Sequence, residues 1–347
     1  MSVVKPKVAI LGVTGMIGNS LFGVLKNSCD LLLMYRNEDK LNLLQQKYGG
    51  VTNKIPLLSE PALPVGREGL GVTDSESLLT RREECKKYRL DLLPAYQEYV
   101  SGFYGKLHCP TIQSLLIELK SCNFVINSLG IIKPYCDSDP GLAFFVNSVF
   151  PQILAEELGK KLIQITTDCA FSGFAGAPYD ETAPKLPPDI YGASKALGEP
   201  LKALVIRCST IGPELTGNRG LLAWVVSQSG KEINGYTNHW WNGITSIELG
   251  KVCQKIINQE INPEPGIYHI FSDDITKHDL LVKLNQKFNL NCKINSVASP
   301  VAIDRRLRTI KNLNQQLQIP SIDEMITSLP LSCLLAVTLA TMGTCLA

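Results

Sequence analysis

The stretch that most constrains the fold is a glycine-rich turn near the N-terminus, Gly12-Val-Thr-Gly15-Met-Ile-Gly18. It follows a short apolar run, residues 8–11, and precedes apolar residues at helical spacing, Leu21, Phe22 and Leu25. This order predicts a strand, a tight turn and a helix. Glycines at such a junction let the backbone approach a pyrophosphate, which the unpaired N–H groups at the helix N-terminus can bind.

The turn is therefore a candidate dinucleotide-binding site. We expect its contacts to come from Gly12, Thr14, Gly15, Met16, Ile17 and Gly18. The second predicted strand, residues 31–35, is followed by Arg36. A basic residue at this place suits the 2′-phosphate of NADP, whereas an acidic one would bind the ribose hydroxyls of NAD. Arg36 thus favours NADPH over NADH as the cofactor.

Strands alternate with helices through the first 207 residues. Residues 51–105 interrupt this alternation with prolines, glycines and a charged stretch, and we interpret them as an insertion. Beyond it we expect helices over 111–120 and 141–158 and strands over 124–128, 162–165 and 204–207. The alternation predicts an α/β fold in which residues 1–207 form a Rossmann-type, doubly wound parallel sheet.

The pattern becomes irregular from residue 208 onward. Helices are expected near 220–228, 246–258, 277–288 and 310–317, and a strand near 267–271. We interpret residues 208–327 as a smaller, mixed α/β lobe that binds the substrate. Residues 328–347 form an apolar tail. Its threonine, serine and glycine residues make it less hydrophobic than a convincing membrane-spanning segment.

A tyrosine and a lysine four residues apart, Tyr191 and Lys195, are the candidate catalytic pair. Residues at this spacing lie on one face of a helix, which places the phenol beside the ammonium. A nearby cation favours the ionised phenol, so we expect Lys195 to lower the pKa of Tyr191 from its ordinary value of about 10. Thr166, Thr167 and Asp168 end a predicted strand at the same edge of the sheet. Alone, the pair is weak evidence for a catalytic site, because in a chain with 11 tyrosines a tyrosine four residues before a lysine also arises by chance. The neighbouring Thr166, Thr167 and Asp168 supply the context that it needs.

Composition narrows the class of partner. A hydrophobic share of 45% with 19% charged residues fits a folded soluble protein, and a net charge of +2 indicates no nucleic-acid partner. The 11 cysteines are scattered without a Cys-x-x-Cys pair, which argues against a metal site and for reduced thiols in the cytoplasm. We expect no membrane partner, and a homodimer is the candidate assembly.

The glycine turn, Thr167 and the pair Tyr191 and Lys195 together resemble the extended short-chain dehydrogenase/reductase superfamily. Four runs narrow the resemblance to the dTDP-4-dehydrorhamnose reductase family of sugar-nucleotide enzymes: residues 127–133, 166–173, 191–199 and 241–249. The resemblance implies an oxidoreductase that uses NAD(P)H to reduce a 4-keto sugar nucleotide, as in dTDP-rhamnose biosynthesis.

The resemblance also implies roles for single residues. Tyr191 protonates the carbonyl oxygen, Thr167 donates a hydrogen bond to it, and Lys195 binds the nicotinamide ribose. The loop after the strand at 124–128 begins with Ser128, Leu129 and Gly130. Because ligands lie at the carboxyl ends of strands in an open parallel sheet, we expect this loop to contact the cofactor.

Candidate substrate-binding residues are Lys133, Asp168, Arg219 and Asn238. Basic side chains suit the diphosphate of a sugar nucleotide, and Arg305 is a further candidate on this ground. His239, beside two tryptophans, is a candidate for stacking on a base or sugar. His269 lies inside an apolar strand, so we expect it to be a hydrogen-bonded core residue.

Two alternatives stay open. Sugar-nucleotide epimerases and dehydratases share these motifs, but dehydratases carry an Asp-Glu pair after the threonine, and here Cys169 follows Asp168. A non-catalytic, NADP-binding regulatory subunit, such as the methionine adenosyltransferase beta subunit that the family resembles, is the second alternative. Reductases of the family also commonly carry a tryptophan where this chain has Thr210, which leaves the identity of the sugar open.

Overall fold

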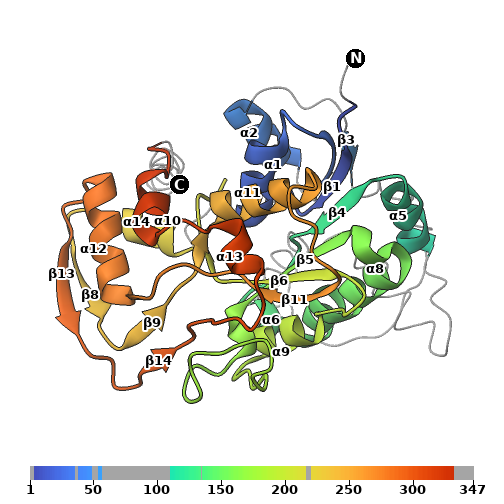
Figure 1. Cartoon of the computed structure of the whole chain (residues 1–347). Coiled ribbons are helices and arrows are strands. Elements are labelled where there is room, and N and C mark those ends of the chain that lie inside the picture. Colours follow the sequence, from blue (N-terminus) through green and yellow to red (C-terminus); the bar gives the residue numbers. More distant parts are fainter. Residues whose placement is uncertain are drawn as a thin grey trace, which may run out of the picture.

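The computed structural model describes residues 4–35, 38–48, 54–56, 110–133, 135–215 and 220–331. Two predicted site residues, Arg36 and Arg219, lie outside these ranges. So do most of the predicted insertion and residues 332–347 of the apolar tail. Figure 1 shows the arrangement of the described elements.

A seven-stranded sheet forms the centre of the molecule, in the order β11-β6-β5-β4-β1-β2-β3 (Figure 1). Its strands are β1 (Lys7–Leu11), β2 (Asp30–Tyr35), β3 (Lys54–Pro56), β4 (Phe124–Asn127), β5 (Leu162–Thr166), β6 (Leu204–Arg207) and β11 (Gly266–His269). Every neighbouring pair is parallel. The order of the strands reverses between β1 and β4, which is where open α/β sheets bind ligands. The predicted doubly wound parallel sheet is confirmed.

The two edges of the sheet depart from the predicted boundaries. Residues 54–56, placed in the insertion by the sequence analysis, form β3 and pair with β2. At the other edge β11, from the region assigned to the substrate lobe, pairs with β6. A three-residue strand carries too little periodicity to be recognised, and local patterning indicates a strand without indicating its partner.

Helices cover both faces of the sheet because its central strands are buried on both sides. Val8 and Ile10 of β1 belong to the core under α1 (Met16–Leu25), α2 (Glu38–Tyr48) and α11 (Ser246–Ile257). Ala9 and Leu11 belong to the core under α5 (Pro110–Lys120) and α8 (Phe150–Leu158). Successive side chains of a strand point to opposite faces, so a continuous apolar run is what a sheet covered on both faces requires.

The predicted helix over residues 141–158 consists of three segments. They are α7 (Pro140–Phe144), a π-helical turn (Phe145–Val149) and α8 (Phe150–Leu158). Asp139 begins the first segment, because its side chain accepts a hydrogen bond from the Leu142 backbone N–H at 3.0 Å. Single π turns inside helices often occur at functional sites.

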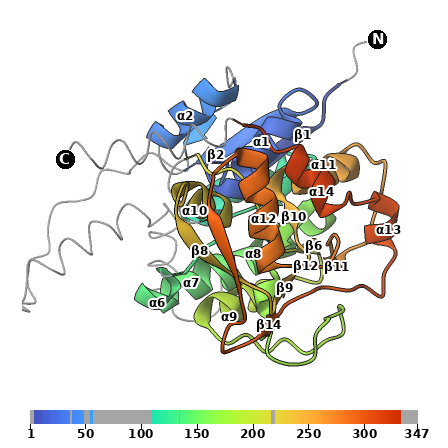
Figure 2. The same cartoon turned by 90° about the vertical axis from the view of Figure 1, so that its left-hand side faces the viewer.

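Most of the remaining elements lie together on the side of the central sheet that faces the viewer in Figure 2, and we call this group the second lobe. Its strands are β7 (Thr210–Ile211), β8 (Glu232–Tyr236), β9 (His239–Trp241), β10 (Ile244–Thr245), β12 (Ile275–Thr276), β13 (Lys293–Val297) and β14 (Ile303–Asp304). Its helices are α10 (Leu221–Ser227), α12 (Lys277–Phe288), α13 (Leu313–Leu317) and α14 (Ile322–Thr327). Two shorter helices, α6 (Tyr135–Ser138) and α9 (Ile190–Leu197), belong to the first lobe. The helix expected over 310–317 begins later than predicted, at Leu313.

The second lobe is fastened to the first by α11, which packs along α1. The hydroxyls of Ser20 and Ser246 are hydrogen-bonded at 2.8 Å, and Gln254 donates to the Ser28 hydroxyl at 3.0 Å. An added Cβ at Gly250 would lie 2.9 Å from a methyl carbon of Val24. The two helices therefore approach closely at this glycine. Each of the helices that the structure describes is too short or too polar to cross a lipid bilayer.

Candidate active site

The glycine turn between β1 and α1 forms a bare backbone cradle. Gly12 has a φ of 81°, a conformation that favours glycine. An added Cβ at Gly18 would lie 2.1 Å from the Gly12 carbonyl oxygen, which no real contact allows. Gly15 is the N-cap of α1, and no side chain caps this helix. The first N–H groups of α1 therefore have no capping side chain, and the cradle fits the pyrophosphate of a dinucleotide.

The loop after β4 lies against this cradle. The Ser128 hydroxyl donates to the Leu11 carbonyl at 2.7 Å. An added Cβ at Gly12 would lie 2.8 Å from a methyl carbon of Leu129, and one at Gly130 would lie 3.9 Å from Lys195 Nζ. The structure thus brings the predicted glycine turn, the predicted loop and the predicted catalytic lysine to one edge of the sheet.

Helix α9 carries Tyr191 and Lys195. It begins at Asp189, whose carboxylate accepts from the Gly192 backbone N–H at 2.8 Å. The ammonium of Lys195 donates to the Ile165 carbonyl at the end of β5, at 2.9 Å. Burial lowers the pKa of Lys195 to about 8, although the Glu199 carboxylate acts in the opposite direction.

The pKa of Tyr191 departs from the prediction. Burial raises it well above its ordinary value, with Cys169 and Asp168 adding to the rise and a hydrogen bond with Thr167 opposing it. The expectation of a lowered pKa is wrong for this structure, because burial of the phenol is the largest effect on the pKa and raises it. The phenol is therefore held in its protonated form, as a proton donor needs.

Thr167 and Asp168 lie directly beyond β5, where Asp168 begins a short 3-10 turn that Thr167 caps. The Thr167 hydroxyl donates to the Asp168 carboxylate at 3.1 Å and accepts from the Cys169 backbone N–H at 3.2 Å. Both residues are buried. Burial, and then the neighbouring Asp168, raises the pKa of the Cys169 thiol to about 11, so this thiol stays protonated.

Asn147, in the π-helical turn, is a residue that the sequence analysis misses. It is 1% exposed and exchanges two hydrogen bonds of 2.9 Å with the Ile131 backbone. Its amide also donates to the Ser194 hydroxyl of α9 at 3.0 Å. Asn147 therefore ties the loop after β4 to α9. The signal in the sequence is an asparagine in the middle of an apolar helical stretch, where a polar side chain must find partners.

A buried polar cluster lies between the end of α9 and the central sheet. Arg207 of β6 bonds to the Glu199 carboxylate and donates from Nη1 to His269 Nε2 at 2.6 Å. His269 Nδ1 lies 2.7 Å from the Arg308 carbonyl, so the ring is neutral with its proton on Nδ1. Burial, and then Arg207, lowers the pKa of His269 to about 4. The prediction of a hydrogen-bonded core histidine is confirmed.

The predicted substrate residues are dispersed. Lys133 forms an ion pair with Asp189, the cap of α9. Arg305 donates to the carbonyls of Phe171 and Ser172 at 3.1 and 3.2 Å, next to the 3-10 turn. Asn238 uses both ends of its amide on the Ser299 backbone. A ring nitrogen of His239 lies 3.0 Å from the Val301 carbonyl. Asn238 and His239 thus hold the β8–β9 turn against the backbone of Ser299 and Val301. Their substrate roles stay predictions.

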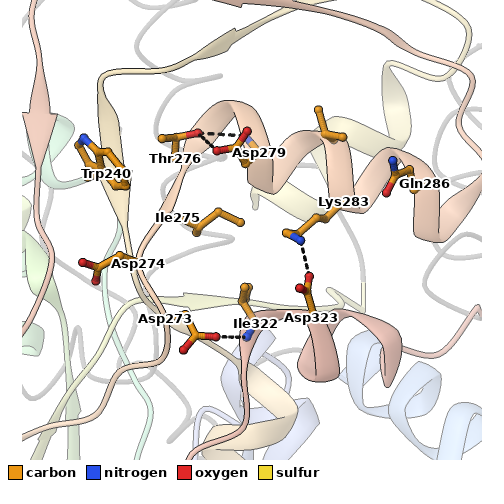
Figure 3. Close-up of a pocket in the computed structure, with 11 residues that line it drawn as sticks. Trp240, Asp273, Asp274, Ile275, Thr276, Asp279, Lys283, Gln286, Ile322 and Asp323 are labelled. Carbon is orange, nitrogen blue, oxygen red and sulfur yellow. Dashed lines mark hydrogen bonds and ion pairs between the residues drawn. The ribbon is translucent and has the colours of Figure 1, made fainter.

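An acidic hollow of about 620 Å³ lies in the second lobe (Figure 3). It is lined by Trp240, Asp273, Asp274, Ile275, Thr276, Asp279, Val282, Lys283, Gln286, Ile322 and Asp323. Its carboxylates are already bonded: Asp323 pairs with Lys283, and Asp279 bonds to Thr276. None of the predicted site residues lines this hollow, so it is separate from the Tyr191 site.

Comparison with known proteins agrees with this arrangement. Residues 115–308 match the family described as the RmlD substrate binding domain. The spore coat polysaccharide biosynthesis protein SpsK of Bacillus subtilis (strain 168) is 32% identical over 188 residues, 51% of this chain and 65% of that protein. The dTDP-4-dehydrorhamnose reductase of Streptomyces griseus is 41% identical over 66 residues, 18% of this chain and 22% of that protein. The chain thus spans less than two thirds of the length of these relatives.

Two solved structures share the fold. The dTDP-4-dehydrorhamnose reductase of Bacillus anthracis str. Ames, in complex with NADP, has a TM-score of 0.59 at 18% identity, covering 93% of this chain and 98% of that one. The Bordetella bronchiseptica enzyme WbmG, in complex with NAD and UDP, has a TM-score of 0.63 at 11% identity, covering 96% of each chain. The family match extends over more than half of the chain and includes the loop after β4, Thr167, Tyr191 and Lys195. The resemblance drawn from the sequence is therefore confirmed, and the chain belongs to the RmlD substrate-binding domain family of extended short-chain dehydrogenases/reductases.

Proposed function

We propose that the protein reduces the keto group of a 4-keto sugar nucleotide with NADPH, with Tyr191 as the proton donor. The observation that carries the proposal is the meeting of Tyr191, Thr167 and Lys195 at the edge of the sheet that holds the glycine cradle. A carbonyl that becomes an alcohol needs hydrogen-bond donors at its oxygen and a proton. Thr167 and Tyr191 offer hydroxyls for both tasks.

The dinucleotide would be held by the cradle from Gly12 to Gly18, the loop from Ser128 to Gly130, and Lys195. NADPH supplies a hydride to the carbonyl carbon. The raised pKa of Tyr191 keeps its proton available until the carbonyl oxygen gains negative charge. Thr167 donates to Asp168 here and would turn its hydroxyl toward the substrate oxygen. Lys195 would then bind the nicotinamide ribose while remaining near Gly130.

The choice of NADPH rests on Arg36, which follows β2 in the sequence and suits a 2′-phosphate. The structural relatives carry NADP in one case and NAD in the other, which supports a nicotinamide cofactor of either kind. Replacing Arg36 with alanine should weaken NADPH binding and leave NADH binding unchanged. Fluorescence titration with the two cofactors measures both affinities.

The reductase proposal is tested with purified protein, NADPH and a dTDP-4-keto-6-deoxy sugar. The absorbance of the reduced nicotinamide should fall, and Tyr191→Phe should abolish this turnover while NADPH binding is retained. Tyr236→Phe, at a tyrosine in the second lobe with 39% exposure, is the matched control and should keep full activity.

Two other outcomes decide between the alternatives. Conversion of a 4-hydroxy sugar nucleotide into a 4-keto-6-deoxy product, without net use of cofactor, would identify a dehydratase. NADPH binding with no turnover across a panel of keto sugars would indicate a regulatory subunit.

A further inference from the structure

A buried amide lies directly after the last glycine of the cradle. Asn19 is 0% exposed and lies at the end of the first turn of α1. Its amide nitrogen donates to the carbonyls of Gly15 and Met16, at 3.0 and 2.8 Å, and to the carbonyl of Pro213 at 3.0 Å. Because an amide nitrogen carries two hydrogens, one of its N–H groups is shared between these acceptors. The proposed reaction gives this side chain no role.

The carbonyl end of the same amide faces α2. It accepts from Lys47 Nζ at 3.2 Å and from the Tyr48 hydroxyl at 3.4 Å, both in the last turn of that helix. These partners allow the amide one orientation, because donors lie at its oxygen and acceptors at its nitrogen. A buried polar group whose partners are all present fixes the geometry of the elements that it joins. Asn19 thus joins α1, α2 and the chain around Pro213.

The chain around Pro213 comes from the strand beside β5. We call residues 208–213, which follow β6, the linking segment. Its first residue, Cys208, donates from its backbone N–H to the Thr166 carbonyl at the end of β5, at 3.4 Å. Its middle forms β7, which pairs with β10, and its last residue is Pro213. The linking segment therefore connects the end of β5, which Thr167 follows, to the first turn of α1.

Asn19 also bonds to the peptide groups that would bind the pyrophosphate. The carbonyl of Gly15 and the N–H of Met16 belong to one planar peptide unit, and the carbonyl of Met16 and the N–H of Ile17 belong to the next. Both N–H groups lie at the N-terminus of α1, where no side chain caps the helix. A hydrogen bond to the carbonyl of a peptide unit polarises its N–H and fixes its plane. The side chain that holds the linking segment therefore also orients the phosphate donors.

We propose that Asn19 is a positioning residue that couples the glycine cradle to the linking segment, so that a dinucleotide bound at the cradle also fixes residues 208–213. The proposal rests on the proposed function, because it takes the cradle to bind NADPH. It deepens that function by naming the residue that transmits cofactor binding toward the substrate side. Cofactor binding then reduces the motion of the edge at which the ketone is reduced, before the sugar nucleotide binds.

Hydrogen exchange measured by mass spectrometry tests this coupling, with NADPH at saturation as the probe. In the wild type, NADPH should slow exchange in peptides from residues 12–18 and from residues 208–215, in the second by at least about fivefold. Asn19→Leu keeps the approximate size of the side chain and removes its hydrogen bonds. It should keep the slowing at residues 12–18 and lose the slowing at residues 208–215.

A second variant and a control accompany Asn19→Leu. Asn19→Asp keeps the shape and still accepts from Lys47, but its carboxylate cannot donate to Pro213, so it should behave like Asn19→Leu. Ser28→Ala removes a different bond to α11, the one from Gln254, just beyond the C-terminus of α1. It is the control and should respond to NADPH like the wild type. Thermal unfolding of each variant checks that it is folded, and Asn19→Asp decides if Asn19→Leu is not.

The two peptides separate failure of the coupling from failure of the proposed function. Slowing at residues 208–215 that survives in a folded Asn19 variant would overturn the coupling, because direct contact with the cofactor would then explain it. Slowing confined to residues 12–18 in the wild type would also overturn the coupling and leave cofactor binding intact. Exchange unchanged at both places would contradict cofactor binding itself, and both proposals with it.

Discussion

Glu199 and Arg207 form a two-pronged ion pair in the interior, with Nε–Oε1 and Nη2–Oε2 distances of 2.9 and 2.6 Å. Their side chains are 0% and 1% exposed. The pair joins the segment after α9 to β6, and so connects the helix of Tyr191 to the central sheet. Removing one member would leave the other charge buried without its partner, which costs far more than losing an ion pair at the surface.

Glu199→Ala should therefore lower the free energy of unfolding by about 3–5 kcal/mol. Urea denaturation followed by circular dichroism measures this change. Glu156→Ala, which removes an exposed ion pair with Lys202, is the control and should cost about 1 kcal/mol or less. Equal effects of the two variants would contradict this reading of the interior pair.

Stability should fall as the pH drops from about 6.5 toward 4, with His269 as one cause. Its pKa is lowered to about 4 in the folded protein, so the unfolded chain binds a proton first. The stability contributed by neutral His269 is present above pH 6.5 and is lost through this window, by roughly 3 kcal/mol at most. Denaturation curves at pH 7 and pH 4.5 should differ less for His269→Gln than for the wild type. A pH dependence unchanged by the substitution would contradict this assignment.

Gly18→Ala should abolish or strongly weaken NADPH binding. Its Cβ would meet the Gly12 carbonyl at 2.1 Å, so the cradle must open. We expect at least a tenfold loss of affinity in a fluorescence titration. Gly220→Ala is the control, because its Cβ would make only ordinary contacts at 3.5 Å or more. An unchanged affinity in Gly18→Ala would show that the cradle does not bind the cofactor.

Asn147→Ala should destabilise the protein and weaken cofactor binding together. The substitution leaves the N–H and carbonyl of Ile131 without their partner, at a cost of about 1–3 kcal/mol. The loop that begins at Ser128 then loses its tie to α9. Thermal unfolding and NADPH titration measure the two effects. Asn295→Ala, at a half-buried asparagine whose hydrogen bond to Glu232 is exposed to solvent, should change neither.

The parts of the site that the sequence predicts are those carried by local spacing. The glycine turn follows from three glycines between a strand and a helix, and Tyr191 and Lys195 share a face because they are four apart on α9. Spacing along one helix says nothing about the Ile165 carbonyl on a neighbouring strand. That carbonyl accepts a hydrogen bond from the lysine ammonium, and burial of the phenol, which spacing also does not reveal, raises the pKa of Tyr191.

Residues that long-range folding brings to the site escape prediction. Asn147 reaches the loop after β4 from a π-helical turn, where its amide bonds to the Ile131 backbone. The same holds for the partner of β11, since a strand pattern does not name its neighbour. Side-chain chemistry indicates that such residues need partners, and only the fold identifies them.

The pairing of β11 with β6 has a consequence for dividing the chain. A fragment that ends at Arg207 would leave β6 with an open edge and α1 without the helix that covers it. Open strand edges invite pairing with other chains. The two halves should therefore be recovered by co-expression as complementing fragments, with residues 266–269 of one polypeptide completing the sheet of the other.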